Sequence, residues 1–198
     1  MTGKVQKRRD ELRARLVDIA EDIIARDGIN AVKARALANA AGCAVGAIYN
    51  VFDDLQDIII AVNGRTFRKL GVAVAARIEG METAPPADRL IAMSYAYLDF
   101  AKHHANLWRC LFEFKLTADM DVPQWYWQEM MKLFSHISAP LQQVFPEKST
   151  DDIALMTRTL FSSIHGIVLL GLENRISGVP HGQLKDMIAL LLTIVTQK

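Results

Sequence analysis

The sequence predicts an all-α protein, and three observations lead to this prediction. Apolar residues recur at spacings of three and four, as at Leu12, Leu16, Ile19 and Ile23, which places them on one face of a helix. Strand-like alternation of apolar and polar residues between turn signals is absent from the sequence. Apolar residues make up 51% of the 198 positions, which is enough for a substantial core and argues against disorder.

The N-terminal part of the chain is expected to contain three short helices. The first carries the apolar repeat just described and should end near Asp27, because Gly28 follows it as a helix-terminating residue. A second helix is expected over about residues 34–41, before Gly42, and a third over about residues 45–52. Together these helices predict a small N-terminal domain over residues 1–53.

The rest of the chain, residues 54–198, is expected to form a larger helical domain. Asp53 and Asp54 open a long helix that reaches about Glu79, since acidic side chains are favourable at the positive end of a helix. This helix is the natural connector between the two domains. Proline and glycine mark the boundaries of five further helices, expected over about residues 86–103, 107–114, 123–144, 151–175 and 181–196, with breaks at Pro85, Pro146, Gly178 and Pro180.

The charge of the chain is nearly balanced but unevenly distributed. The net charge is +1, yet residues 1–52 carry nine Lys and Arg against six Asp and Glu, and residues 53–198 carry fourteen against sixteen. The basic excess is densest in KVQKRR, residues 4–9, which indicates either contact with phosphates or a solvated, frayed terminus. Charge alone leaves both interpretations open.

Cysteine content and hydropathy bear on the cellular location. Two cysteines, Cys43 and Cys110, supply neither a disulfide framework nor a set of zinc ligands, and they fit a reducing cytosol. The N-terminus has no apolar signal core, and no stretch approaches the roughly 20 apolar residues of a membrane span. The segment IHGIVLLGL, residues 164–172, is interpreted as part of a buried helix. We therefore expect a cytoplasmic protein with no membrane partner.

Residues 34–52 have the pattern of two helices joined by a tight turn. Gly42 starts the turn, where a positive φ is expected, and Cys43 follows as a small buried residue. This is the helix-turn-helix pattern, in which the second helix leads into the major groove of DNA with its N-terminal residues. The alternative is a plain helical hairpin in a core, with Gly46 serving helix–helix packing. The residues expected to face inward are Leu37, Ala41, Ile48 and Val51, with Ala38 at the crossing.

The exposed positions of these two helices are the candidate DNA-binding residues. Small side chains let the second helix approach the groove, and Val45 and Ala47 can touch thymine methyl groups. Tyr49 can donate its hydroxyl to a phosphate, and Asn50 can pair with adenine or contact the backbone. Basic residues at the start of the first helix can reach phosphates or a base edge. The full set is Lys33, Arg35, Ala44, Val45, Gly46, Ala47, Tyr49 and Asn50.

The stretch GINAVKARALANAAGCAVGAIYNVF, residues 28–52, resembles the TetR family of bacterial transcriptional regulators. The family pattern has a Gly after the first helix, then Arg-x-(Ile/Leu)-Ala, Ala-Gly and Gly-x-(Leu/Ile)-Tyr-x-x-Phe. Residues 95–114 and 164–178 also resemble the branch of this family named for a Trp-His-Gly motif, with Ile164 in the place of the Trp. The residues that match the first pattern are Gly28, Arg35, Leu37, Ala38, Ala41, Gly42, Gly46, Ile48, Tyr49 and Phe52.

Three regions depart from the family pattern. Lys33 and Ala44 stand where the family usually has a capping Ser or Thr, and such a cap is typically worth about 1 kcal/mol. Residues 53–55, Asp-Asp-Leu, lie where the family commonly has a Lys that reaches a phosphate. DNA binding is then expected to rely more on Lys33, Arg35, Tyr49 and the basic arm.

The resemblance implies a ligand-responsive DNA-binding regulator, by default a repressor released from a palindromic operator by an apolar or aromatic small molecule. It implies a homodimer in which the last two helices of each subunit pair; burial of their apolar residues within the monomer is the alternative. It also implies an effector pocket in the helical body, but no catalytic residue, cofactor or metal. Aromatic and methionine-rich segments supply the candidate ligand-binding residues, which are Trp108, Phe112, Trp125, Tyr126, Met130, Phe134 and His165.

Two other functions compete with this expectation. DDLQD, residues 53–57, has the Asp-Asp-x-x-Asp spacing with which some helical prenyl-diphosphate enzymes bind magnesium. Those enzymes need a second acidic motif, which the sequence lacks, so charge at a helix N-terminus is the simpler explanation. The other alternative is a helical ligand-binding protein that has lost operator binding, and salt-dependent binding to duplex DNA distinguishes it from a regulator.

Overall fold

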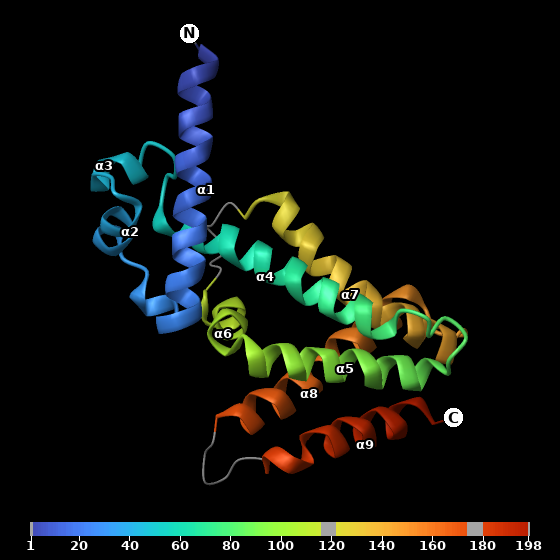
Figure 1. Ribbon diagram of the computed structural model, residues 1–198. Coiled ribbons are helices and arrows are strands. Elements are labelled where there is room, and N and C mark those ends of the chain that lie inside the picture. Colours follow the sequence, from blue (N-terminus) through green and yellow to red (C-terminus); the bar gives the residue numbers. More distant parts are fainter. Residues whose placement is uncertain (1, 116–121, 174–179, 198) are drawn as a thin grey trace. The chain divides into compact units, whose positions relative to one another are not determined.

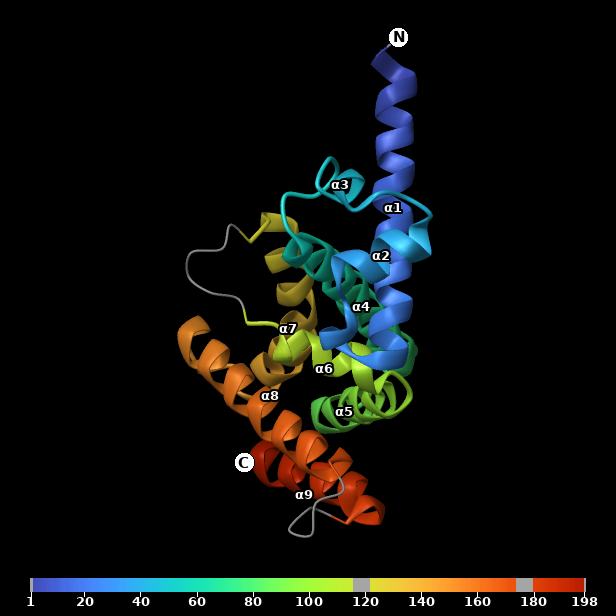
Figure 2. The ribbon, with the colours of Figure 1, turned by 90° about the vertical axis from the view of Figure 1, so that its left-hand side faces the viewer.

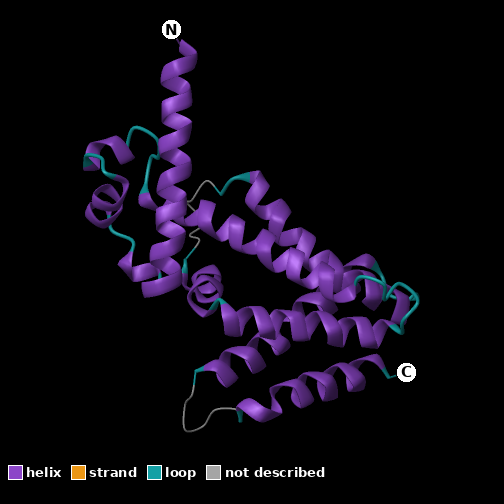
Figure 3. Cartoon of the chain, in the orientation of Figure 1, coloured by secondary structure: helices purple, strands orange, loops and turns teal. Residues whose placement is uncertain are grey.

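The structure, a computed structural model, describes residues 2–115, 122–173 and 180–197, and over these ranges it contains helices but no strands (Figures 1 and 3). The prediction of an all-α fold is therefore confirmed. Two single turns of 3-10 helix, η1 and η2, accompany the α-helices. In chain order the elements are α1 Thr2–Asp27, η1 Ile29–Ala31, α2 Ala34–Ala41, α3 Val45–Ile48, α4 Leu55–Ile78, α5 Pro86–His103, α6 Ala105–Glu113, α7 Gln124–Val144, α8 Thr150–Leu172, η2 His181–Gln183 and α9 Leu184–Thr196.

The helix boundaries follow the proline and glycine signals closely, with one clear exception. α3 ends at Ile48 rather than near residue 52. The N–H groups of Val51 and Phe52 both donate to the carbonyl of Ile48 at 3.0 Å, so the chain turns away there instead of continuing the helix. The expected end of α8 near residue 175 and the break at Gly178 lie outside the described residues.

The chain folds into two compact units, each built from two separate segments. Unit 1 comprises Met1–Arg68 and His104–Tyr126, and unit 2 comprises Lys69–His103 and Trp127–Lys198. The long helix α4 therefore contributes to both units. The predicted domain boundary between residues 53 and 54 stays a prediction.

Unit 1 has one core, to which α1, α2, α3, the first part of α4 and α6 all contribute (Figure 2). α6 joins this unit although it lies about 80 positions after α1. Its Asn106 side chain donates to the carbonyls of Ala25 at 3.0 Å and Arg26 at 3.3 Å, which satisfies the open end of α1. Residues with no exposed surface come from each of these helices: Leu16, Leu37, Ile48, Ile58 and Cys110.

Unit 2 is built around α5, α8 and α9, which pack on one another in Figure 1, with the second part of α4 and most of α7. Gly171 of α8 lies against Leu184 at the start of α9. A β-carbon at position 171 would clash with Cδ2 of Leu184 and lie 2.8 Å from its Cδ1, so an alanine there would force the buried Leu184 side chain to shift. Fully buried residues of the unit include Leu98, Leu141, Val168, Leu184, Ile188 and Leu192.

α8 corrects one expectation drawn from hydropathy. Its 23 residues include an 18-residue window with a mean hydropathy of 1.6, long and apolar enough to cross a membrane by length and composition alone. The prediction that no stretch approaches such a span was therefore wrong on this criterion. A single helix of this kind is weak evidence for a membrane span, because helices of protein cores and interfaces have the same composition.

Candidate functional site

The turn between α2 and α3 has the geometry that the sequence predicts. Gly42 follows α2 with a φ of 64°, in the left-handed region that favours glycine. The N–H of Cys43 donates to the carbonyl of Ala38 at 3.0 Å and closes the end of α2. Leu37 and Ile48 are fully buried where the two helices pack together. Cys43 itself is half-buried, not buried as expected.

The opposite side of α3 is open. Val45 is 39% exposed and Tyr49 is 49% exposed, and Ala44, Gly46 and Asn50 are exposed as well. A β-carbon at Gly46 would meet no atom within 4 Å in the part of the chain that the structure describes. Packing against another helix of the same chain therefore does not explain this glycine. Of the residues predicted here, only Ala47 is half-buried, and Tyr49 and Asn50 lie in the turn after α3 instead of within it.

The two basic candidates lie at the start of α2. Lys33 is the N-cap residue, and Arg35 is in the first turn; both are exposed. Neither Lys33 at the start of α2 nor Ala44 at the start of α3 makes a side-chain capping hydrogen bond within the described residues. Both helix starts therefore lack a side-chain cap, as the departures from the family pattern indicate.

Two arginines of α1 hold the helix-turn-helix in place, and sequence reasoning did not single them out. Arg13 donates from Nη1 to the carbonyl of Val51 at 2.6 Å, and its guanidinium lies 4.1 Å from the centre of the Phe52 ring. Arg15 donates to the carbonyl of Ala41, the last residue of α2, at 3.5 Å. α1 thus holds the C-terminal end of α2 and the turn that follows α3.

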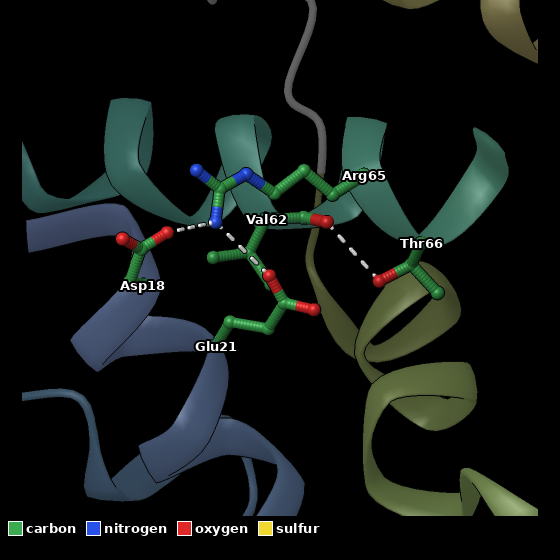
Figure 4. Close-up of polar contacts among 5 residues, drawn as sticks. All are labelled: Asp18, Glu21, Val62, Arg65 and Thr66. Atoms are coloured by element: carbon green, nitrogen blue, oxygen red, sulfur yellow. Dashed lines mark hydrogen bonds and ion pairs between the residues drawn. The ribbon is translucent and has the colours of Figure 1, made fainter. Parts of the chain in front are cut away.

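A third arginine joins α1 to α4 within unit 1 (Figure 4). Nη1 of Arg65 lies 2.6 Å from Oδ1 of Asp18 and 3.1 Å from Oε2 of Glu21. Asp18 and Glu21 lie three positions apart on α1, so one guanidinium reaches both carboxylates. One turn along from Val62, Thr66 is fully buried and donates its hydroxyl to the Val62 carbonyl at 3.1 Å. Arg65 thus makes its ion pairs from one side of α4, and Thr66 lies buried on another side.

Four of the seven predicted ligand-binding residues lie in unit 1: Trp108, Phe112, Trp125 and Tyr126. Trp108 and Tyr126 are each 1% exposed, whereas Phe112 and Trp125 are partly exposed. The rings pair edge to face, Trp108 with Phe112 at 5.5 Å and Trp125 with Tyr126 at 5.9 Å between centroids. Burial raises the pKa of Tyr126 to about 12, so its phenol is neutral and can serve as a hydrogen-bonding group at neutral pH.

The other three, Met130, Phe134 and His165, lie in unit 2, where two of them join an aromatic cluster. Phe161 meets Phe134 edge to face at 5.2 Å and stacks on the His165 ring at 5.8 Å. Nδ1 of His165 lies 2.8 Å from the hydroxyl of Tyr97, and burial lowers the pKa of His165. A neutral imidazole and a phenol are therefore held together beside apolar rings. We call Tyr97, Phe134, Phe161 and His165 the aromatic cluster.

The carboxylates of DDLQD cap a helix. Oδ1 of Asp54 accepts the N–H of Gln56 at 3.1 Å, and Oδ2 of Asp57 accepts the N–H of Asp54 at 3.0 Å. These bonds satisfy two backbone N–H groups at the start of α4. The described residues include no group of three or more His, Cys, Asp or Glu placed to hold a metal ion.

Helices α8 and α9 carry both buried and solvent-exposed apolar side chains. Ile153, Leu160, Ile164 and Val168 of α8 are buried within the chain. Four other large apolar residues of α8 and α9 are 51–62% exposed: Leu155, Leu170, Leu190 and Ile194. Part of the apolar content of these helices therefore lies outside the core of the chain.

Comparisons with known proteins identify a family model, a relative and solved structures that this chain resembles. Residues 90–195 match the family model described as the tetracyclin repressor-like, C-terminal domain. The HTH-type transcriptional regulator BetI of Cronobacter sakazakii is 28% identical over 171 residues, which cover 85% of this chain and 81% of BetI. A protein of unknown function from Rhodococcus sp. RHA1 has a similar structure, with a TM-score of 0.72, 22% identity, and coverage of 91% of this chain and 93% of that one. The structure of RolR in complex with resorcinol gives a TM-score of 0.68 at 18% identity, with 96% and 89% covered.

Proposed function

The chain belongs to the tetracycline-repressor-like (TetR) family of transcriptional regulators, and we propose that it is a repressor that a small apolar or aromatic effector releases from a palindromic DNA operator. The proposal rests on the exposed side of α3. That side carries small residues, while Ile48 on the opposite side is fully buried. An exposed helix with open space at Gly46 suits close approach by a macromolecule outside the chain.

The DNA contacts are assigned to the eight predicted residues of α2, α3 and the following turn. Lys33, Arg35 and the hydroxyl of Tyr49 contact phosphates, which position the protein without reading sequence. Val45, Ala47 and Asn50 contact base edges, since apolar groups suit thymine methyls and an amide suits adenine. Ala44 and Gly46 allow the backbone to approach the groove. Replacing Tyr49 by Phe should weaken binding to all duplexes alike; unchanged affinity would remove the phosphate contact.

A second copy of the chain is proposed to cover the exposed apolar residues of α8 and α9. Leu155, Leu170, Leu190 and Ile194 would otherwise remain more than half exposed to water. Pairing of two helices from each subunit gives a two-fold axis, which in turn sets two recognition helices on successive major grooves. This interface also accounts for the hydropathy of α8 without a membrane, and we place the dimer in the cytoplasm.

The effector is proposed to be a small aromatic or apolar molecule bound by the helical body. The aromatic cluster of unit 2 supplies stacking surfaces from Phe134 and Phe161 and a hydrogen-bonding pair from His165 and Tyr97. Met130 is proposed to contribute to the same site. The candidates within unit 1 are Trp108, Phe112, Trp125 and Tyr126. The RolR structure, which contains resorcinol, supports a small aromatic effector for this fold.

Release from DNA is proposed to be a shift between two populations. The effector must bind more tightly to the state whose recognition helices do not fit the operator. α4 is the proposed lever, because Arg65 ties it to Asp18 and Glu21 of α1, which in turn holds the helix-turn-helix through Arg13. A binding regulator of this kind needs no catalytic group and no cofactor.

Selection of bound duplexes from a random pool, repeated at two salt concentrations, tests the proposal. A palindromic motif enriched at both salts is expected, because base contacts discriminate among sequences even where phosphate contacts weaken. Genes near matching sites then suggest effectors to assay, and operator release by one of them should be lost in His165→Gln and Phe134→Ala.

One observation favours a second candidate, a helical ligand-binding protein without an operator. Lys33 and Ala44 supply no side-chain hydroxyl at the two helix starts, and residues 53–55 carry two acidic side chains where a lysine could contact a phosphate. For such a protein, no motif is enriched in the selection, and weak duplex binding disappears when salt is raised.

A further inference from the structure

The N-terminal part of α1 extends beyond the rest of unit 1. In Figures 1 and 2 the N-terminal end of this helix projects past α3, which belongs to the same unit. Residues 3–11, which we call the arm, are all exposed, whereas Leu12 packs in part against the core of the unit and Leu16 is fully buried. From Leu12 back to Gly3 the helix is about 14 Å long, at 1.5 Å per residue. Packing within the described residues therefore does not account for the composition of the arm.

The arm is basic, and its cations are unpaired. Residues 3–11 carry four Lys and Arg against two Asp and Glu, a net charge of +2 (4 − 2). Oδ1 of Asp10 accepts from the side chain of Gln6 at 2.9 Å, but no cation of the arm pairs with a carboxylate of the described residues. Exposed cations are common on protein surfaces, so their position decides whether they bind anything. The four cations are Lys4, Lys7, Arg8 and Arg9.

Two of these cations lie on the side of α1 that faces the helix-turn-helix. Leu12 and Arg13 mark that side, since Leu12 packs against the core of unit 1 and Arg13 donates to the turn after α3. Arg8 and Arg9 precede them by four positions each, and residues four apart share one side of a helix. The two arginines therefore lie on the side of the helix-turn-helix, one helical turn beyond the Arg13 contact.

Duplex DNA is the partner that fits this arrangement. A duplex entered by α3 presents a phosphate backbone on each side of a major groove that is about 12 Å wide. An arm of about 14 Å that begins beside the helix-turn-helix is long enough to reach the backbone that borders this groove. An anionic membrane fits less well, because a helix that binds a membrane surface needs an apolar side and Val5 is the only apolar side chain of the arm.

We propose that Arg8 and Arg9 bind two phosphates of the DNA backbone beside the groove that α3 enters, as a second DNA contact outside the helix-turn-helix. The inference rests on the proposed function, since it needs α3 to bind DNA. Lys4 and Lys7 lie nearer the end of the helix and add to the general attraction. Because phosphates carry no sequence information, the arm strengthens binding to every duplex and does not alter the preferred operator.

The salt dependence of duplex binding tests this contact without a known operator. The full chain is titrated against a fluorescently labelled duplex of random sequence at several salt concentrations, and fluorescence anisotropy gives the affinity. Each phosphate contact adds about 0.9 to the slope of log affinity against log salt concentration, so Arg8→Gln with Arg9→Gln should reduce the slope by about 1.8. The melting temperature of this arm variant should equal that of the wild type, because both side chains are exposed.

A control variant separates this contact from a general effect of charge. Lys148→Gln with Arg158→Gln removes two charges from exposed positions of unit 2 and should leave the slope unchanged. An equal reduction in both variants would overturn the arm contact, and so would an unchanged slope in the arm variant, although the wild type would still bind DNA as a regulator. No duplex binding by the wild type would overturn the proposed function together with the arm contact. If the arm variant loses affinity for vesicles of phosphatidylcholine and phosphatidylserine but not for the duplex, the partner is a membrane surface and the DNA contact is refuted.

Discussion

Replacing Arg65 by Gln should destabilise the protein by about 2 kcal/mol, because it removes two charged hydrogen bonds of unequal value. The contact to Asp18 is 2.6 Å long, but Asp18 is 62% exposed, so its share is no more than about 0.5 kcal/mol. Glu21 is only 13% exposed, and its contact at 3.1 Å is shielded from water. A hydrogen bond to such a charged group contributes about 1.5 kcal/mol or more.

Urea denaturation followed by far-UV circular dichroism measures this effect. Arg77→Gln is the matched control, because Arg77 also makes one charged contact between helices, to Asp99 at 2.8 Å, but both side chains are over one-third exposed. We expect that control to lose no more than about 1 kcal/mol. A double-mutant cycle of Arg65→Gln with Glu21→Gln should give a coupling of about 1.5 kcal/mol. Equal losses for Arg65 and Arg77, or a coupling near zero, would refute the reasoning.

Three further predictions concern individual side chains. Gly171→Ala should lower the melting temperature, because a β-carbon 2.8 Å from the fully buried Leu184 costs about 1–3 kcal/mol of overpacking. This cost exceeds the about 1 kcal/mol that alanine gains over glycine in a helix. Gly46→Ala is the control, because its β-carbon meets open space, and it should not lower the melting temperature. Burial lowers the pKa of His165, so the unfolded chain takes up a proton at this residue before the folded protein does as the pH falls below about 6.5. The free energy of unfolding should therefore decrease more from pH 7.5 to 5 in the wild type than in His165→Gln. Equal decreases would contradict this. Burial raises the pKa of the fully buried Cys110 thiol to about 12, so iodoacetamide at pH 8 should modify the half-buried Cys43 first by mass spectrometry, and equal rates would show that Cys110 is accessible.

The features that the sequence predicted well are those set by neighbouring residues. Helix α2 begins and ends where the glycine and apolar spacing indicate, and Gly42 adopts the predicted positive φ. Leu37, Ala41 and Ile48 are buried, because the 3.6-residue period of a helix fixes which residues share its inner side, and Val51 is buried in the turn after α3. The end of α3 was missed, since no glycine or proline marks it and the turn depends on bonds back to Ile48.

The features that the sequence did not reveal depend on residues that are far apart in the chain. Arg13 and Arg65 look like any arginine on a helix, and only the fold brings Val51, Asp18 and Glu21 to them. The aromatic residues predicted as one pocket are divided between two units, a division that composition cannot indicate.

The place of α6 in unit 1 has a consequence for the order in which the protein folds. Asn106, Leu107 and Cys110 complete the core around α1, yet they leave the ribosome only after the whole of α4 and α5 has been made. At a synthesis rate of about 5–20 residues per second, the first three helices wait several seconds for these partners. During that interval the apolar side of α1 has no cover from α6, so the nascent segment exposes apolar surface that the finished protein buries.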